Sequence, residues 1–491
     1  MKTEPALPRS DLLDSPAAGP RAARGGAMRA GGYALGTLLA LVSSPLMIRH
    51  LGVEDFGRYV TVMSLVTVIA GFTEGGLNTI ALREYAARTG DDRRAVMRDL
   101  VGLRVALTLI GIAGGVAFAL AAGYDSVLVV GTIAAGFALL LQSLQLLLAA
   151  ALQGELRFGW ITITELLRHA LFVALILALV AAQADLGLFF LAQIPAFALT
   201  LMLVARLVSR IMPFRPAFHP RRWWPLLHAT FAYAIAVALN AAYFRIAILA
   251  LSLLATERET GYFATAFRVI EVLIAVPALI IGAAFPILAR AARDDRDRLD
   301  YAAGRLVEVG VVMGVWLALG IFLAAEPIIR LLAGDQSDPS IGLLRIQSFA
   351  LVATFVIVAS GYVLLSLHRH RTILLINVAA LATSLGLSAV LVPAYGATGA
   401  AVALLGAEVV LAVASLAALV RLRPALGETL RRAPVVIAAG ACAGLIGVVP
   451  GLPSVAAAVL GLLAYPLLLV VMRRFPPEVS HALRGTTLLR P

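Results

Sequence analysis

Charge, cysteine and lysine are all scarce in this sequence. Only 14% of its 491 residues are charged, Lys2 is the only lysine, and Cys442 is the only cysteine. A single cysteine excludes an intramolecular disulfide and a metal cluster held by cysteines. Long polar segments are also missing between Ala27 and Met472, so that part of the chain has no room for a soluble catalytic domain.

Apolar residues are abundant instead, in stretches long enough to cross a membrane. Hydrophobic residues make up 61% of the chain, and the mean hydropathy is +0.94. A transmembrane helix needs about 20 predominantly apolar residues. The stretches predict an all-α polytopic membrane protein with about 14 transmembrane helices, at residues 28–48, 59–80, 101–122, 127–151, 163–182, 187–208, 231–254, 262–288, 304–325, 346–367, 373–392, 397–420, 434–450 and 454–472.

The basic residues are distributed unevenly between these stretches. Most of the 40 Lys and Arg residues lie in the N-terminal segment and in every second connection after it. Because Lys and Arg accumulate on the cytoplasmic side, both termini are predicted to be cytoplasmic. Clusters such as Arg93-Arg94 and Arg221-Arg222 would lie against anionic lipid headgroups, which accounts for the net charge of +12 without nucleic-acid binding.

An internal repeat relates the two halves of the chain. Leu51–Tyr59 and Ala255–Phe263 each place an acidic loop before a glycine and an aromatic residue at a helix entry. An even number of predicted helices separates the two segments, so both copies keep the same orientation. The repeat predicts two six-helix bundles in parallel, followed by two additional C-terminal helices, an architecture that permits alternating access.

The predicted organisation follows from these spans and the repeat. A disordered cytoplasmic tail, a six-helix bundle, a cytoplasmic linker, a second six-helix bundle, two additional transmembrane helices and a cytoplasmic tail are expected at residues 1–26, 27–210, 211–230, 231–420, 421–475 and 476–491.

Several short motifs in this order resemble a known family. The motifs are His50–Tyr59, Glu74–Leu77, Arg83–Ala86, Gly261–Ala266, Phe285-Pro286 and Tyr395–Ala400. Their order and spacing resemble the Wzx-like polysaccharide and O-antigen flippases, the polysaccharide transporter branch of the multidrug/oligosaccharidyl-lipid/polysaccharide superfamily. The resemblance covers about residues 28 to 420.

The resemblance implies transport of a polyprenyl-diphosphate-linked oligosaccharide from the cytoplasmic to the outer leaflet of a bacterial inner membrane. Such transport serves surface or exopolysaccharide biosynthesis and is commonly driven by a proton or sodium gradient. Polysaccharide polymerase and glycosyltransferases are the protein partners that it implies. No cofactor, metal or catalytic residue is expected.

Three charged residues within the predicted seventh and eighth helices form the main candidate site. Arg245 and Glu271 each lie roughly 14–15 Å from the outer end at 1.5 Å per residue, on antiparallel neighbours. Arg268 shares a helix face with Glu271. The cluster would be net positive and could bind a diphosphate bidentately; the alternative is a salt-bridge triad with no substrate contact. Where many members of the family have an acidic residue, this chain has Ala247, which argues against ion coupling at this helix.

Two acidic residues are candidates for ion coupling. Glu408 lies near the middle of its predicted span, where a carboxyl group could carry a proton or simply hydrogen-bond between helices. Glu74 lies in a glycine-rich helix end, which predicts either a gate or cavity wall or a capped helix end. Arg104, near a cytoplasmic helix end, is expected to reach the interface.

Two asparagines complete the set of candidate binding residues. Asn240 and Asn377 lie within predicted spans and could hydrogen-bond to sugar hydroxyls. The alternative is that they bridge helices, as buried asparagines often do in membranes.

Three other functions compete with polysaccharide flipping. A multidrug exporter of the same superfamily would suit an acidic cavity better than the cationic cluster predicted here, and a lipid II flippase is a second alternative. A membrane-embedded polymerase or ligase typically uses a large outer loop, whereas the longest outer loop here, Glu326–Arg345, is short and offers no convincing catalytic set.

Overall fold

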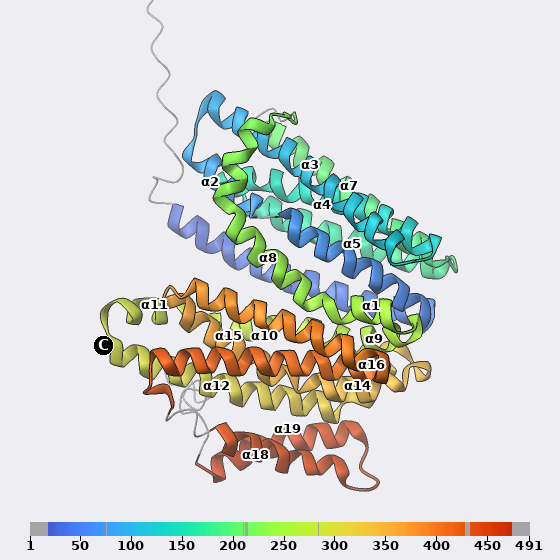
Figure 1. Cartoon of the computed structure of the whole chain (residues 1–491), viewed down its shortest axis with the longest axis vertical. Helices are drawn as coiled ribbons and strands as arrows, with labels where there is room; N and C mark the ends of the chain where they lie inside the picture. The colour runs from blue at the N-terminus through green and yellow to red at the C-terminus, as the bar shows by residue number, and fades with distance from the viewer. Residues whose placement is uncertain are drawn as a thin grey trace, which may run out of the picture. The chain divides into compact units, whose positions relative to one another are not determined.

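A computed structural model of the chain describes residues 18–74, 76–209, 211, 215–282, 284–427 and 433–473. Within these residues the chain forms α-helices joined by short turns and 3-10 helices, and it contains no β-strand (Figure 1). The elements are α1 (Ala18–Glu74), α2 (Leu77–Ala87), α3 (Gly90–Ala121), α4 (Ser126–Gly154), α5 (Phe158–Ala181), α6 (Leu186–Leu191), α7 (Gln193–Ser209), α8 (Pro220–Leu254), α9 (Glu257–Leu273), α10 (Ala275–Gly282), α11 (Phe285–Asp294), α12 (Arg296–Leu323), α13 (Ala325–Ala333), η2 (Asp335–Ser337), α14 (Pro339–Ser348), α15 (Ala350–Ser366), α16 (His370–Leu422), α18 (Ala433–Gly444), η3 (Leu445–Val448) and α19 (Ser454–Val471).

Eleven helices in the described part of the chain are long and apolar enough to cross a membrane. Two longer helices contain a glycine whose backbone is not helical: Gly52 in α1 has φ 73° and ψ 177°, and Gly396 in α16 has φ 52° and ψ −131°. The 53 residues of α16 would extend about 80 Å as one straight helix, far beyond the roughly 30 Å hydrocarbon core. The break at Gly396 therefore separates two helical segments that are each long enough to span a bilayer.

The prediction of an all-α polytopic membrane protein is confirmed. The number of fourteen spans and the two six-helix bundles stay predictions. Residues 1–17 and 474–491, which hold most of the predicted tails, lie outside the described residues. Helix α1 begins at Ala18, so the last part of the predicted N-terminal tail is helical, and α8 begins at Pro220, within the predicted linker.

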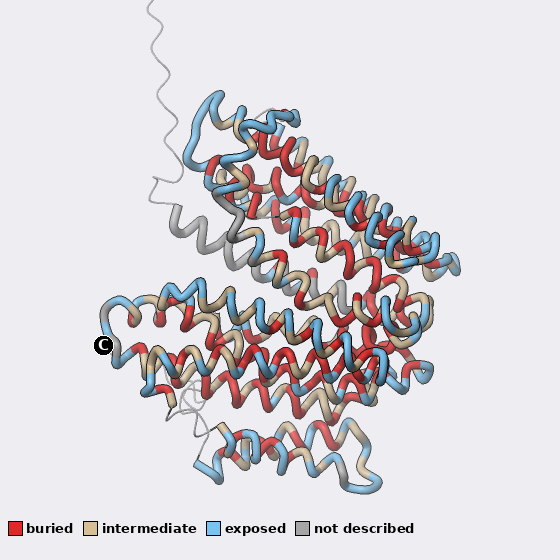
Figure 2. Tube along the Cα trace, viewed as in Figure 1, coloured by how far each residue is buried: buried red, intermediate tan, exposed pale blue. Residues whose placement is uncertain are grey.

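The described helices form two compact units. One comprises residues up to His50 together with Val62–Ala241, and the other comprises Leu51–Thr61 together with the residues from Ala242 onward. Each unit has its own apolar interior, and Figure 2 shows buried residues recurring along the helices. The first interior includes Leu100, Leu147 and Val204, and the second includes Ile248, Phe263, Leu344 and Leu351.

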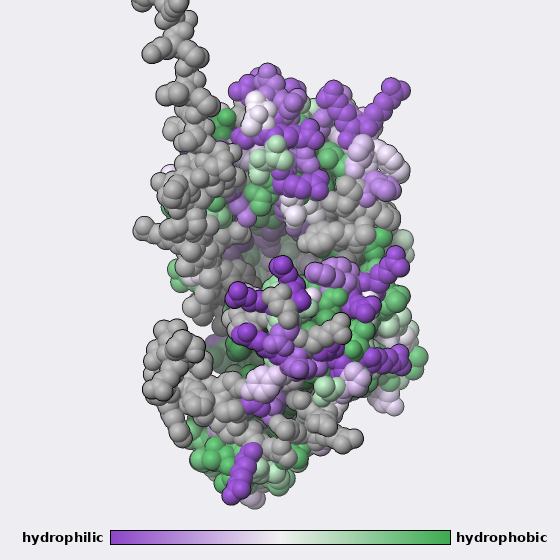
Figure 3. Space-filling view, turned by 90° about the vertical axis from the view of Figure 1, so that its left-hand side faces the viewer, coloured by the Kyte–Doolittle hydropathy of each residue, from purple (hydrophilic) through white to green (hydrophobic). Residues whose placement is uncertain are grey.

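The outer faces of many helices are apolar, as expected for contact with lipid tails. Ile110, Leu279, Leu375 and Val471 are each at least two-thirds exposed, a pattern that would be unusual for a water-soluble protein. Figure 3 shows hydrophilic side chains gathered on the face that it presents, with hydrophobic surface beside them.

Side-chain caps fix where several helices begin. Asp125, Thr256 and Asp295 each accept a hydrogen bond from the backbone N–H three residues further on, at 2.9, 3.2 and 3.0 Å. These caps satisfy N–H groups that the first helical turn leaves without intrahelical partners. The start of α9, capped by Thr256, determines the register in which this helix presents its charged residues.

Candidate functional site

The structure brings Arg245, Arg268 and Glu271 together within the second unit. Arg245 Nη2 on α8 donates to Glu271 Oε1 on α9, and Arg268 Nη1 donates to Glu271 Oε2 at 2.8 Å. The side chains are 19%, 31% and 28% exposed, respectively, so the cluster is partly buried but accessible. One carboxylate is therefore shared by two guanidinium groups.

The cluster has hydrogen-bonding capacity and charge left over. Two guanidinium groups against one carboxylate leave a net positive charge. Arg245 Nε is buried and has no hydrogen-bond partner among the described residues. A buried donor without a partner is costly, so the site is chemically suited to an anion that could accept from it.

The two asparagines differ in their surroundings. Asn240 lies on α8 with an exposed side chain, one turn and a half before Arg245, and Asn377 lies half-buried in the first segment of α16. Their predicted contact with sugar hydroxyls stays a prediction.

Glu408 occupies a different place in the second unit, deep among helices α8, α15 and α16. It is only 4% exposed. Tyr243 Oη donates to Glu408 Oε1 at 2.8 Å, and Thr354 Oγ1 lies 3.1 Å from Glu408 Oε2. Sequence reasoning identified this glutamate from its depth but not its two hydroxyl partners, which lie on other helices.

Glu74 belongs to a polar chain in the first unit, where α1 ends and α2 begins. Asn78 Nδ2 donates to Glu74 Oε1 at 3.0 Å, and Arg104 Nη2 donates to Asn78 Oδ1 at 2.9 Å. Arg104 Nη1 also donates to the Thr73 carbonyl at 2.9 Å. We call these contacts the Arg104 relay (Glu74, Asn78, Arg104 and the Thr73 carbonyl). The relay joins side chains of α2 and α3 to a carbonyl group that has no intrahelical partner where α1 ends.

The expectation that Arg104 reaches the membrane interface is wrong. Its side chain is 1% exposed, because the break between α1 and α2, where Gly76 has φ 74°, leaves the Thr73 carbonyl and the Asn78 amide for the guanidinium to bind. Distance from a helix end could not reveal this acceptor pair, because the acceptors lie on neighbouring helical segments.

The two copies of the repeat motif contact each other. Both copies lie within the second unit, which includes Leu51–Thr61. A Cβ on Gly57 would lie 2.2 Å from the Glu257 carbonyl oxygen, and a Cβ on Gly261 would lie 1.8 Å from the Val53 carbonyl oxygen. The contact is reciprocal, because Val53 and Glu257 hold equivalent positions in the two copies. Both glycines are needed for this close backbone approach.

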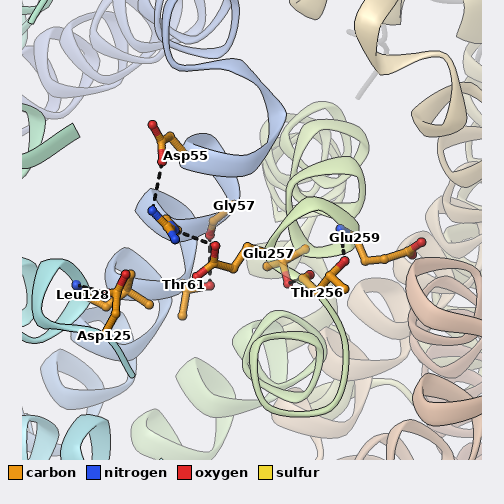
Figure 4. A network of polar contacts seen from close by, with 10 residues as sticks. Asp55, Gly57, Thr61, Asp125, Leu128, Thr256, Glu257 and Glu259 are labelled. Carbon is orange, nitrogen blue, oxygen red and sulfur yellow. Dashed lines mark hydrogen bonds and ion pairs between the residues drawn. The ribbon is translucent and has the colours of Figure 1, made fainter. Parts of the chain in front are cut away.

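Charged residues surround this glycine contact, and we call the whole arrangement the repeat clasp (Gly57, Arg58, Glu257 and Gly261). Arg58 Nε donates to Glu257 Oε2 at 2.6 Å, and Arg58 Nη1 lies 3.5 Å from Asp55 Oδ1. Figure 4 shows Asp55 and Glu257 at the two ends of this network. Sequence reasoning identified the repeat but not the contact between its copies.

Glu259, two residues beyond Glu257, stabilises the break in α16. Its Oε2 accepts a hydrogen bond from the Ala397 N–H at 2.5 Å, directly after Gly396. The carboxylate thus caps the N-terminus of the second segment of α16, where a negative charge is favoured by the helix dipole.

Comparison with known proteins identifies the family and the fold. A family model described as polysaccharide biosynthesis protein matches residues 46–342. The structure resembles the lipid II flippase MurJ in its inward closed conformation, with a TM-score of 0.74 and 12% identity over 91% of this chain and 98% of that chain. No curated protein sequence matches the chain.

Multidrug transporters share the fold as well. An inward-facing transporter of the MATE family, in the MOP superfamily, gives a TM-score of 0.61 and 14% identity over 80% of this chain and 96% of that chain. The MATE multidrug transporter DinF-BH gives 0.55 and 16% identity over 86% and 99% of the two chains. Identities this low establish a shared fold and leave the substrate to be argued from the site.

Proposed function

We propose, from the premise that the chain belongs to the polysaccharide biosynthesis protein family, that it flips a polyprenyl-diphosphate-linked oligosaccharide across the membrane. Transport would run from the cytoplasmic to the outer leaflet of the bacterial inner membrane, with both termini cytoplasmic, and would supply surface or exopolysaccharide biosynthesis. Glycosyltransferases that build the oligosaccharide and a polymerase that consumes it are the partners expected. The shared fold with flippases and transporters favours transport rather than catalysis.

The single observation that carries the substrate proposal is the Arg245–Glu271–Arg268 cluster. Its net positive charge, its partial exposure and the unpartnered Arg245 Nε suit an anionic headgroup. Guanidinium groups stay charged at any accessible pH and bind phosphate oxygens in pairs. The cluster would hold the diphosphate while Asn240 and Asn377 contact sugar hydroxyls.

Alternating access is the mechanism that we propose for this movement. Transporters that share the fold have been solved in inward-facing and outward-facing conformations. An ion gradient would drive the cycle, and Glu408 and Glu74 are the candidate coupling residues, with a proton or sodium as the ion. Glu74 is hydrogen-bonded within the Arg104 relay, which favours a role in holding the helix end over free exchange of an ion.

Two rival substrates follow from the same fold. Lipid II is the second candidate, because a lipid with a diphosphate group would meet the same cationic cluster and because the lipid II flippase MurJ shares the fold. Drugs are the third candidate, because multidrug transporters share the fold, but a cationic drug is disfavoured by the net positive charge of the cluster.

The experiment uses a strain that lacks the gene and measures surface polysaccharide, lipid-linked precursor and drug susceptibility together. We expect this strain to lose the polymer and to accumulate the precursor on the cytoplasmic leaflet. The wild-type gene should restore the polymer and remove the accumulated precursor, whereas Arg245→Ala should do neither. Arg305→Ala is a matched control, since Arg305 likewise pairs with a glutamate, in this case Glu308 on the same helix, at 2.6 Å. Normal polymer with increased sensitivity to cationic drugs would refute the proposal.

A further inference from the structure

Glu408 is a buried carboxyl group with two hydroxyl partners and apolar surroundings. Its partner Tyr243 belongs to an apolar cluster with Ala380 and Leu411, against which Ile357 and Ile376 pack. Among the described residues on α8, α15 and α16, Tyr243 is the one titratable side chain that faces Glu408, and it donates to Oε1. A carboxylate in such a place would be a buried charge with no cation beside it, which is costly.

Counting hydrogens shows that the contacts of Thr354 favour a protonated partner. Thr354 Oγ1 lies 2.9 Å from the Ala350 carbonyl oxygen and 3.1 Å from Glu408 Oε2. A hydroxyl group carries one hydrogen, so it can donate to only one of these two oxygens. If Thr354 donates to Ala350, as threonines in helices often do, the contact with Oε2 is satisfied only when Oε2 carries a proton and donates to Thr354.

We propose that Glu408, Tyr243 and Thr354 form a proton-binding site with two hydrogen-bonded states. In the protonated state, Glu408 Oε2–H donates to Thr354 Oγ1, Thr354 donates to the Ala350 carbonyl, and Tyr243 donates to Oε1. When the proton leaves, the Thr354 hydroxyl turns and donates to Oε2, so the carboxylate still accepts two hydrogen bonds. The role of this proton in driving transport rests on the proposed flippase function, whereas the site itself does not.

The same geometry argues against a divalent metal ion as the ligand. The site offers the two Glu408 oxygens and two hydroxyl oxygens, and the Tyr243 hydroxyl hydrogen points toward the carboxyl group. No group of three or more His, Cys, Asp or Glu side chains able to hold a metal occurs among the described residues. Ca²⁺ and Mg²⁺ take six or more oxygen ligands, more than the four oxygens of these three side chains.

The test is infrared difference spectroscopy of the purified full-length protein in lipid nanodiscs as the pH is changed, without any substrate. We expect the C=O band of a protonated carboxyl group that titrates with pH in the wild type and is absent from Glu408→Gln. In Tyr243→Phe the band should move to a higher wavenumber, because Oε1 loses a hydrogen bond. Tyr243→Phe changes one hydroxyl group, so it decides the question even where Glu408→Gln does not fold.

The matched control is Glu308→Gln, which removes another buried glutamate that pairs instead with Arg305 at 2.6 Å. This variant should keep the band of the wild type. A band that survives Glu408→Gln, or one that responds to sodium at constant pH, would overturn the proton site. Because the spectra are recorded without substrate, that result would refute the proton site and leave the flippase proposal intact. An intact band in a protein that does not flip lipid-linked oligosaccharide would instead refute the flippase proposal and leave the proton site intact.

Discussion

Arg58 and Glu257 form an ion pair of 2.6 Å between the two copies of the repeat motif. The pair lies beside the reciprocal packing of Gly57 on the Glu257 carbonyl and of Gly261 on the Val53 carbonyl. The repeat clasp therefore joins residues far apart in the chain through one charged contact and one backbone contact. The two contacts should contribute very differently to stability.

The charged contact of the repeat clasp should contribute little. The side chains of Arg58 and Glu257 are 27% and 38% exposed, so solvent screens much of their attraction, and about 0.5 kcal/mol is expected. In a double-mutant cycle of thermal unfolding, Arg58→Glu and Glu257→Arg should each destabilise slightly, and the double swap should recover the loss. A coupling energy of several kcal/mol would contradict this estimate of screening.

The backbone contact should matter more. Gly261→Ala places a Cβ against the Val53 carbonyl, and because backbone cannot move aside easily, we expect a loss of about 1–3 kcal/mol in the free energy of unfolding. Gly386→Ala is the matched control, since nothing lies within 4 Å of the new Cβ there. The control should be neutral or slightly stabilising. Equal melting temperatures for both variants would show that the packing at Gly261 is not tight.

The buried Arg104 relay predicts a large effect in the first unit. Arg104→Leu leaves the Thr73 carbonyl and the Asn78 amide oxygen without their donor, so we expect a loss of about 2–4 kcal/mol. Arg94→Leu removes an exposed arginine paired with Asp91 and should change stability by less than about 0.5 kcal/mol. Thermal unfolding of the two variants in one detergent provides the comparison. A milder effect for Arg104→Leu than for Arg94→Leu would contradict a structural role.

The charge cluster was the part of the candidate site most accessible to sequence reasoning. Arg268 and Glu271 are three residues apart on one helix, and the depth of Arg245 on the preceding helix follows from counting residues to a shared loop. These are local relationships. The helical class followed equally directly, because long apolar stretches admit few other structures in a membrane.

Contacts between distant helices could not be predicted in the same way. Glu408 meets Tyr243 at a separation of 165 residues and Thr354 at 54, and helix rotation, which one sequence does not determine, decides such pairs. Gly52 and Gly396 lie in connections predicted between spans, at residues 49–58 and 393–396. The sequence did not predict that helix continues up to each glycine on both sides, because it does not reveal that their φ angles are 73° and 52°. The repeat clasp could not be predicted either, because the sequence shows that the motif is repeated but not that its two copies contact each other.

The central claim is that the cationic cluster recognises a lipid diphosphate, and direct binding tests it most sharply. Polyprenyl diphosphate would be titrated into the purified protein in nanodiscs, comparing the wild type with Arg245→Gln, Glu271→Gln and the control Arg305→Gln. We predict that Arg245→Gln weakens binding by about tenfold to a hundredfold, the loss of a charged hydrogen bond, while Glu271→Gln and Arg305→Gln retain it. Wild-type affinity in Arg245→Gln would contradict the account and leave the cluster a structural salt bridge.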